Sequence, residues 1–372
     1  MSRSIQTKLG EQLGIKHPIF SFAHSADVTC AVTNAGGYGV YGATRDTPEE
    51  IREKMAYIRA RVGDKPFGVD LVLPRGMPPI DDRGKIEAEL PPEHRKFVQG
   101  LHAKYNIPKT DKPGMRSRFV RSEQMATRQI EAILKTDVNM FACGIGAPSG
   151  AVEQAKADGK ITLALVGNSE HAQHALDSGA EILVAQGHDA GAHTGPIGSF
   201  SLIPQIVDVA GSVPVLAAGG VATGRHIAAS YALGAQGVWL GTVWLGTREH
   251  ALSEILLKKI LAARSQDTVI SRADSGKTLR QIRTAWSEEW AASGAPKPLK
   301  MPYQDILVGD LLGAIDDYEI EALMHFPAGQ SVGFVNTLRS VDQVMNELVR
   351  DAQDCLERLC TNFAATPNEE VS

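Results

Sequence analysis

Short apolar segments alternate with longer amphipathic segments along the chain from His17 onward. Eight of the apolar segments have the length and composition of β-strands, and most end in Gly or Ala, where a chain leaving a sheet needs a permissive backbone. The segments between them carry helix start signals such as Thr47-Pro48-Glu49-Glu50. This alternation predicts a mainly parallel sheet joined by crossover helices, with strands at residues 17–22, 38–43, 66–73, 138–146, 161–167, 180–187, 214–220 and 237–245.

The number of strand and helix units selects between two α/β folds. Eight units in series predict a (β/α)8 barrel, the TIM barrel, whose functional groups gather at the carboxyl ends of the strands. The alternative is an open, doubly wound sheet, but no GxGxxG turn follows the first strand. The glycines of residues 34–42, NAGGYGVYG, come after a helix and before a strand, so we interpret them as a helix end and a turn.

Two regions fall outside the repeat. Residues 75–120 form a connection far longer than usual, which predicts an inserted lid segment over the mouth of the barrel. After residue 250 the chain turns helical and charged, and residues 341–359 place apolar side chains on one helix face. We therefore expect a barrel over residues 1–250 and a helical C-terminal extension over residues 251–372, which packs on the barrel or on the partner subunit of a homodimer. The tail at residues 361–372 is expected to be disordered.

Composition narrows the functional classes. The 372 residues are 43% hydrophobic and 22% charged, as in ordinary soluble proteins, and the net charge of -5 does not favour nucleic acid or anionic lipid. No signal peptide is recognisable, and no apolar run approaches the roughly 20 residues of a membrane span. The four cysteines form no CxxC pair and are too sparse for a disulfide framework. We expect a cytoplasmic protein with a small-molecule substrate and with neither a nucleic-acid nor a membrane partner.

The most informative segment is residues 214–245, where two glycine-rich turns and a helix N-terminus follow neighbouring strands. Barrels of this class commonly hold a phosphate at this place, because glycine lets backbone N–H groups approach the anion and a helix N-terminus favours negative charge. Tight turning from strand to helix is the alternative explanation. The phosphate could belong to a flavin, to pyridoxal phosphate or to a sugar phosphate, and its candidate ligands are Gly219, Gly220, Gly241 and Thr242.

Two further clusters have both a simple and a functional interpretation. His188, Asp189 and His193 are residue types that bind metals, yet their spacing matches neither HExxH nor a facial HxD pattern, so we expect no metal site. Five basic residues of the insertion could hold substrate or cofactor phosphates, but a solvated basic face is the favoured interpretation. These five are Lys109, Lys112, Arg116, Arg118 and Arg121.

Three motifs resemble those of a known family. Gln186–Gly195 resembles QGxEAGGHxG, Ala217–Arg225 resembles AAGGIADGR, and Leu240–Leu245 resembles MGTRFL, all from the nitronate monooxygenases, formerly called 2-nitropropane dioxygenases. The likeness covers most of residues 10–250. It implies a TIM barrel that binds FMN without a covalent bond, with the phosphate on the four candidate ligands given above. The remaining cofactor contacts that it implies are Ser21, Phe22, Ala23, Asp70, Gln186 and Gly191.

The same resemblance makes His193 the catalytic residue. A histidine at the end of the sixth strand can titrate near neutral pH, so it could deprotonate a nitroalkane, bind an anionic nitronate or protonate a reduced substrate. The sequence departs from the family near this site. His24 follows the first strand and becomes, with His188, a candidate substrate contact. Asp70 replaces the usual asparagine, and a carboxylate there would disfavour an anionic ligand unless it is paired or protonated.

Three functions remain open. The first is an FMN-dependent monooxygenase that oxidises alkyl nitronates with O2 to carbonyl compounds and nitrite, and the motifs support it most directly. The second is an NAD(P)H-dependent flavin reductase of a quinone or an enoyl thioester, which the long insertion and the altered end of the first strand favour. The third is a non-enzymatic protein that binds a flavin or another phosphate ligand.

Overall fold

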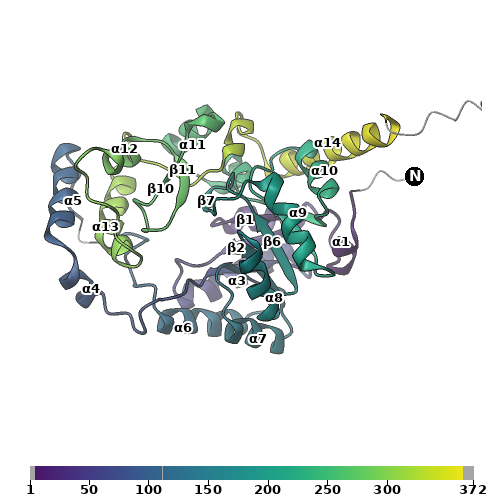
Figure 1. The fold of residues 1–372 in the computed structure, drawn as a ribbon, viewed down its shortest axis with the longest axis horizontal. Helices are drawn as coiled ribbons and strands as arrows, with labels where there is room; N and C mark the ends of the chain where they lie inside the picture. The colour runs from purple at the N-terminus through teal and green to yellow at the C-terminus, as the bar shows by residue number, and fades with distance from the viewer. Residues whose placement is uncertain (1–4, 111, 363–372) are drawn as a thin grey trace, which may run out of the picture.

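Eight parallel strands close into a barrel in the computed structural model, which describes residues 5–110 and 112–362 (Figure 1). The ring closes where β9 pairs with β1, so the predicted (β/α)8 barrel is confirmed and the open sheet is wrong. Each predicted strand supplies one barrel strand. These are β1 (Ile19–Ala23), β2 (Tyr38–Gly42), β3 (Gly68–Val72), β4 (Met140–Ile145), β5 (Ile161–Val166), β6 (Ile182–Gln186), β8 (Val215–Ala218) and β9 (Gly237–Leu240).

The last predicted strand is shorter than expected. β9 ends at Leu240, and Thr242–Gly246 form a 3-10 helix, η1. The Trp244 side chain is fully buried, and its indole Nε1 donates to the carbonyl oxygen of Leu240 at 2.8 Å, which holds the chain in a turn over the strand end. A buried turn and a buried strand are equally apolar, so composition alone does not separate them.

Helices cover the outside of the barrel, and side chains fill its interior. Because successive strand residues point to opposite faces, Phe20 and Val40 pack inside the barrel, whereas Ile19 and Tyr41 pack in the layer between strands and helices. The close-packed interior gives the strand ends a rigid floor. Leu9 of α1 (Lys8–Gln12) packs with the interior side chains. The surrounding helices are α2 (Ala26–Asn34), α3 (Pro48–Val62), α6 (Glu123–Leu134), α7 (Ser149–Ala157), α8 (Ser169–Asp177), α9 (Ser199–Ala210) and α10 (Gly224–Ala232).

The insertion and the C-terminal region form a second core beside the barrel. In Figure 1, α4 (Arg83–Glu89) and α5 (Pro92–Lys104) of the insertion lie near α13 (Tyr303–Asp317), which contacts both. α11 (Glu254–Ala262) and α12 (Ala285–Ala291) complete this core. Trp290 is buried there, and the ring centroid of Phe97 lies 4.8 Å from it. The insertion is therefore not an isolated lid, because it shares its core with a segment far along the chain.

The C-terminal region is not wholly helical, contrary to expectation. β10 (Thr268–Ser271) and β11 (Leu279–Ile282) form an antiparallel pair, and β11 also pairs with the short strand β7 (Ala192–His193) in the loop after β6. Strand formation in such short segments depends on the partner strand more than on local preference, so sequence patterns gave no signal for it. The pairing ties the C-terminal region to the loop that carries His193.

The last helix, α14 (Val341–Asn362), packs on the barrel through α10 and α2. Leu359 of its predicted apolar face is exposed, whereas the buried members are Val341, Val344, Met345, Leu348 and Ala352. Gly224 permits the close contact with α10, since a Cβ atom there would lie 2.1 Å from the backbone nitrogen of Ala352. The domain boundary at residue 250 and the homodimer stay predictions. The predicted disorder of the tail is wrong for Thr361 and Asn362, which belong to α14, and the rest of the tail lies outside the described residues.

The four cysteines are free thiols, and two of them, Cys30 and Cys143, are buried. Within residues 5–110 and 112–362, none of the helices combines the length and the apolar character needed to cross a bilayer.

Candidate active site

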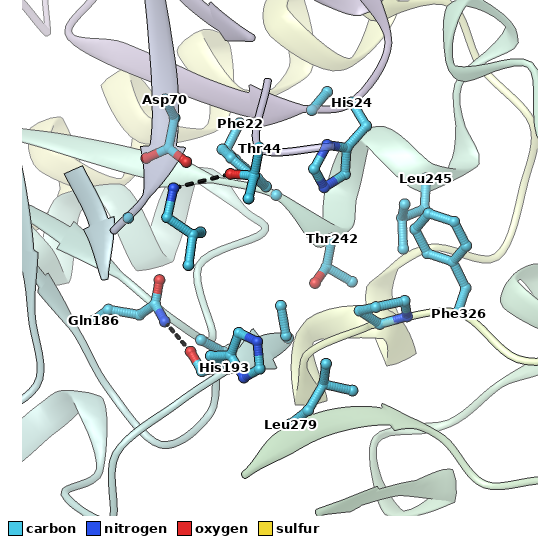
Figure 2. A pocket seen from close by; sticks show the side chains of 18 of the residues that line it. Phe22, His24, Thr44, Asp70, Gln186, His193, Thr242, Leu245, Leu279 and Phe326 are labelled. Atoms are coloured by element: carbon cyan, nitrogen blue, oxygen red, sulfur yellow. Dashed lines mark hydrogen bonds between the residues drawn. The ribbon is translucent and has the colours of Figure 1, made fainter. Parts of the chain in front are cut away.

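A pocket lies at the carboxyl ends of the barrel strands, where the barrel meets the second core (Figure 2). Strand ends form its floor, while α13, β11 and residues 325–331 supply the opposite wall. The structure thus brings together side chains from segments far apart in sequence. The predicted site residues that line this pocket are Phe22, Ala23, His24, Asp70, Gln186, Gly191, His193, Gly219, Gly220, Gly241 and Thr242.

Two predicted residues are not among those that line the pocket. Ser21 is fully buried, and the alternation of side chains along β1 places it on the opposite face of the strand from Phe22. The His188 ring turns into its own loop, where Nδ1 lies 2.8 Å from the carbonyl oxygen of Gly195. The structure therefore gives no support to a cofactor contact by the Ser21 side chain or to a substrate contact by His188.

His193 is held at the pocket by strand pairing with β11 on one side and by the side chain of Gln186 on the other. It belongs to β7, and its backbone carbonyl accepts from Gln186 Nε2 at 2.5 Å (Figure 2). Its ring Nδ1 lies 3.0 Å from the carbonyl oxygen of Thr278, so Nδ1 carries the proton and Nε2 keeps a lone pair. Burial, and then the charges of Arg121 and Arg116, lower the pKa of His193 to about 4. The imidazole is therefore neutral at pH 7.

Two further histidines of the same cavity also have lowered pKa values. His24, predicted as a substrate contact, donates from Nδ1 to the carbonyl oxygen of Gly42 at 2.8 Å and packs edge-on against Phe22. Burial, and then the charge of Arg45, lower its pKa to about 4. His250, which the sequence did not single out, also lines the pocket, and burial lowers its pKa to about 4. His24, His193 and His250 are thus neutral near pH 7.

Asp70 is buried at the pocket floor with no partner for its carboxyl group. It is 1% exposed, and neither oxygen has a hydrogen-bond partner among the described residues. Burial raises the pKa of Asp70 to about 8, so the group is mainly protonated at neutral pH. A protonated carboxyl can donate one hydrogen bond, as asparagine does. The departure from the family at this position therefore adds little negative charge to the site.

The turns after β8 and β9 fit a phosphate group. Gly219 and Gly220 have φ angles of +88° and +77°, in the left-handed region that favours glycine. α10 starts just beyond them at its N-cap Thr223, and a helix N-terminus favours an anion. Thr242 Oγ1 accepts from the backbone N–H of Gly329 at 2.9 Å, so its own hydroxyl proton can be donated to a ligand. Permissive backbone, a helix N-terminus and a hydroxyl donor therefore meet at one edge of the pocket.

The three candidate metal ligands, His188, Asp189 and His193, form hydrogen bonds with the protein backbone. Asp189 accepts from the backbone N–H of Ser199 at 2.9 Å, and hydrogen bonds from Ser199 outweigh burial to lower the pKa of Asp189. Within the part of the chain that the structure describes, no three His, Cys, Asp or Glu side chains gather in a way that could hold a metal ion.

The basic residues of the insertion do not form one solvated face. Lys109 and Lys112 are exposed, as that interpretation expects. Arg118 turns to the barrel side, where Nη2 lies 2.6 Å from Glu50. Arg116 and Arg121 line the pocket, so the solvated interpretation is wrong for them. The cluster of five basic residues is recognisable in the sequence. Which of the five face the pocket depends on how the insertion packs, and the sequence alone does not show that.

Several pocket residues gave no signal in the sequence. They come from the segment after β2 or from the C-terminal region, whose position on the barrel depends on long-range packing. The main ones are Thr44, Arg45, Leu279, Leu312, Ile315, Asp316, His325, Phe326 and Ser331.

Known proteins resemble this chain in sequence and in fold. A relative from Mycobacterium tuberculosis named "Putative monooxygenase Rv1533" is 37% identical over 372 residues, which cover 95% of this chain and 98% of the relative. The structure of nitroalkane oxidase from Streptomyces ansochromogenes has a TM-score of 0.80 at 23% identity, covering 94% of this chain and 99% of that one. FabK from Thermotoga maritima has a TM-score of 0.76 at 24% identity, covering 96% and 99%. At these identities the two structures establish a shared fold.

The family model described as Nitronate monooxygenase matches residues 5–351, which is most of the chain. The resemblance seen in the three motifs is therefore confirmed, and membership makes the protein an oxidoreductase rather than a non-enzymatic binding protein. It also supports a flavin cofactor, whose phosphate the turns after β8 and β9 would fit. The chain belongs to the nitronate monooxygenase family.

Proposed function

We propose that the protein is an FMN-dependent nitronate monooxygenase, which oxidises alkyl nitronates with O2 to carbonyl compounds and nitrite. One observation carries this proposal beyond family membership: the pocket floor bears little negative charge, while arginines line the wall. His193 is neutral at pH 7, and burial raises the pKa of Asp70 to about 8. Such a pocket favours an anionic ligand over a neutral one of the same size.

The residues present fit FMN at the pocket floor. The backbone at Gly219, Gly220 and Gly241 and the hydroxyl of Thr242 would bind its phosphate. Phe22 and Gln186 would lie along its ring system, and the protonated carboxyl of Asp70 would donate a hydrogen bond to it. When bound, FMN supplies the electron transfer between the organic substrate and O2, which no side chain of the pocket can perform.

His193 would contact the substrate. Its Nε2 lone pair can accept a proton, but a pKa of about 4 makes it a weak base for removing a proton from carbon. We therefore expect the substrate to arrive already ionised, as a nitronate and not as a nitroalkane. A bound anion raises the pKa of a nearby imidazole by Coulomb attraction, so His193 could then hold a proton at Nε2 against the negative charge.

A reductase of a quinone or an enoyl thioester, with NAD(P)H as the reductant, is the second candidate. Arg116 and Arg121 in the pocket wall favour it, since guanidinium groups bind the phosphates of nicotinamide nucleotides well. Protonation of a reduced substrate is harder for a histidine that is neutral at pH 7. This candidate therefore ranks below the monooxygenase.

Anaerobic mixing separates the two candidates. Purified, flavin-loaded protein is mixed in separate cuvettes with an alkyl nitronate, NADH or NADPH. The nitronate is expected to bleach the visible flavin absorbance, and admission of O2 should restore the absorbance with release of nitrite. Bleaching by a nicotinamide nucleotide and not by nitronate would favour the reductase. A protein that stays colourless after incubation with FMN would contradict both candidates.

A further inference from the structure

Three arginines line one side of the pocket and take no part in the proposed contacts with FMN. Arg45 follows β2, while Arg116 and Arg121 come from the end of the insertion. All three line the same pocket, and burial, then the charges of Arg116 and Arg121, lower the pKa of Arg45. We call these three residues the arginine wall.

The members of the arginine wall differ in their partners. Arg116 is paired, since its Nη2 lies 2.9 Å from Asp274 Oδ2. Arg121 Nη1 is buried and has no hydrogen-bond partner. The charges of Asp305 and Asp274 act on Arg45 and partly offset the lowering of its pKa. A buried guanidinium N–H group without a partner is costly, so Arg121 favours an anion from outside the chain.

Two carboxyl groups lie near the wall, and the charges of all three arginines act on one of them, Asp305. Asp305 is 3% exposed, and neither of its carboxylate oxygens has a hydrogen-bond partner. Asp316 lines the pocket itself. Burial raises the pKa of Asp305 and of Asp316, which weakens the negative charge that they can offer. Lys277 adds a further positive charge, which acts on His193. The balance of charge around the wall therefore remains positive.

Apolar side chains lie in the same part of the pocket, at Leu279, Leu312, Ile315 and Phe326. We propose that the arginine wall binds a second acidic group, a carboxylate or a phosphate, at the far end of an amphipathic substrate. The apolar body of this substrate packs on the four side chains above, and its reacting end lies at His193. Guanidinium groups bind either oxyanion through paired N–H bonds. The inference rests on the proposed function, because it describes the substrate of the same pocket.

Calorimetric titration of the flavin-loaded protein tests the wall with three probes of equal chain length: hexanoate, hexyl phosphate and 1-hexanol. At least one of the two anions is expected to bind roughly 10-fold or more tightly than the alcohol, the scale of a charge-assisted hydrogen bond. Arg121→Gln should weaken anion binding by roughly 10-fold to 100-fold and leave the alcohol unchanged. Lys109→Gln, at an exposed lysine of the same insertion, is the matched control and should change none of the three.

The probes also identify the source of the acidic group. Preference for hexanoate would assign it to a carboxylated substrate, and preference for hexyl phosphate with competition by NADH would assign it to a nucleotide; either result supports the wall. Equal binding of all three probes, or unchanged anion affinity in Arg121→Gln, would overturn it. Retention of flavin checks that the variant folds, and Arg45→Gln replaces it if it does not.

The calorimetric experiment measures binding of the probes and requires no turnover. The arginine wall and the proposed function can therefore be refuted independently of each other. Oxidation of a simple alkyl nitronate together with no preference for anions would refute the wall alone. Anion binding that Arg121→Gln abolishes, in a protein that oxidises no nitronate, would support the wall and refute the monooxygenase.

Discussion

Replacing Asp70 by asparagine is expected to stabilise the protein by an amount that grows with pH. Asp70 is buried without a hydrogen-bond partner, and burial raises its pKa to about 8 in the folded chain. In the unfolded chain the group titrates near its ordinary value of 3.8. Between these two values the folded state holds a proton that the unfolded state has lost. The free energy of unfolding of the native chain therefore falls as the pH rises.

The magnitude follows from the width of this pH window. One proton held only by the folded state changes the free energy of unfolding by about 1.4 kcal/mol per pH unit. The loss between about pH 4 and pH 7 is then about 4 kcal/mol, a ceiling that water entering the pocket would reduce. Asparagine has nearly the same size and does not ionise, so Asp70→Asn avoids the loss. The gain should be small near pH 4 and should level off above about pH 8.

Urea unfolding of the flavin-free protein at pH 5, 6, 7 and 8 measures this difference. The native chain, Asp70→Asn and Asp64→Asn are compared, the last at an exposed aspartate that serves as the control. Asp64→Asn should follow the native chain at every pH, whereas the advantage of Asp70→Asn should grow with pH. An advantage of constant size at all four pH values would refute the assignment of a protonated Asp70.

Three further substitutions test the site and the fold. His193→Ala should keep FMN but lower turnover roughly 100-fold or more, the scale of a lost proton-transfer group, and turnover near that of the native chain would remove His193 from the mechanism. Gly220→Leu should abolish flavin retention, because φ is +77° there and a side chain would block the phosphate; normal flavin content after gel filtration would refute the phosphate site. Gly224→Ala should lower stability by about 1–3 kcal/mol, since its Cβ would lie 2.1 Å from the Ala352 nitrogen, and an unchanged thermal midpoint would contradict the packing of α14 on α10.

Local patterns were enough to predict the barrel and much of its floor. Strand length, glycine endings and helix start signals are properties of neighbouring residues, and all eight predicted strands appear in the barrel. The parallel arrangement then determines that their carboxyl ends meet, so the turns after β6, β8 and β9 converge at one pocket. Whether a residue at a strand end reaches the pocket also depends on the face of the strand to which its side chain points. Ser21 and Phe22 are adjacent in sequence, yet only Phe22 lines the pocket.

The opposite wall of the pocket and the charge state of its groups depended on the tertiary structure. Phe326 and Leu279 reach the pocket only because the C-terminal region packs on the insertion and pairs with β7. Arg121 is one of five basic residues that the sequence analysis interpreted as a solvated face, but in the structure it lines the pocket with its Nη1 atom buried. The sequence by itself determined which chemical groups stand at the strand ends, because the order of strands and turns is local information. Only the tertiary structure decided which of these groups are buried away from water. Burial makes His193 and Asp70 neutral, because the energy of a charge depends on everything packed around it.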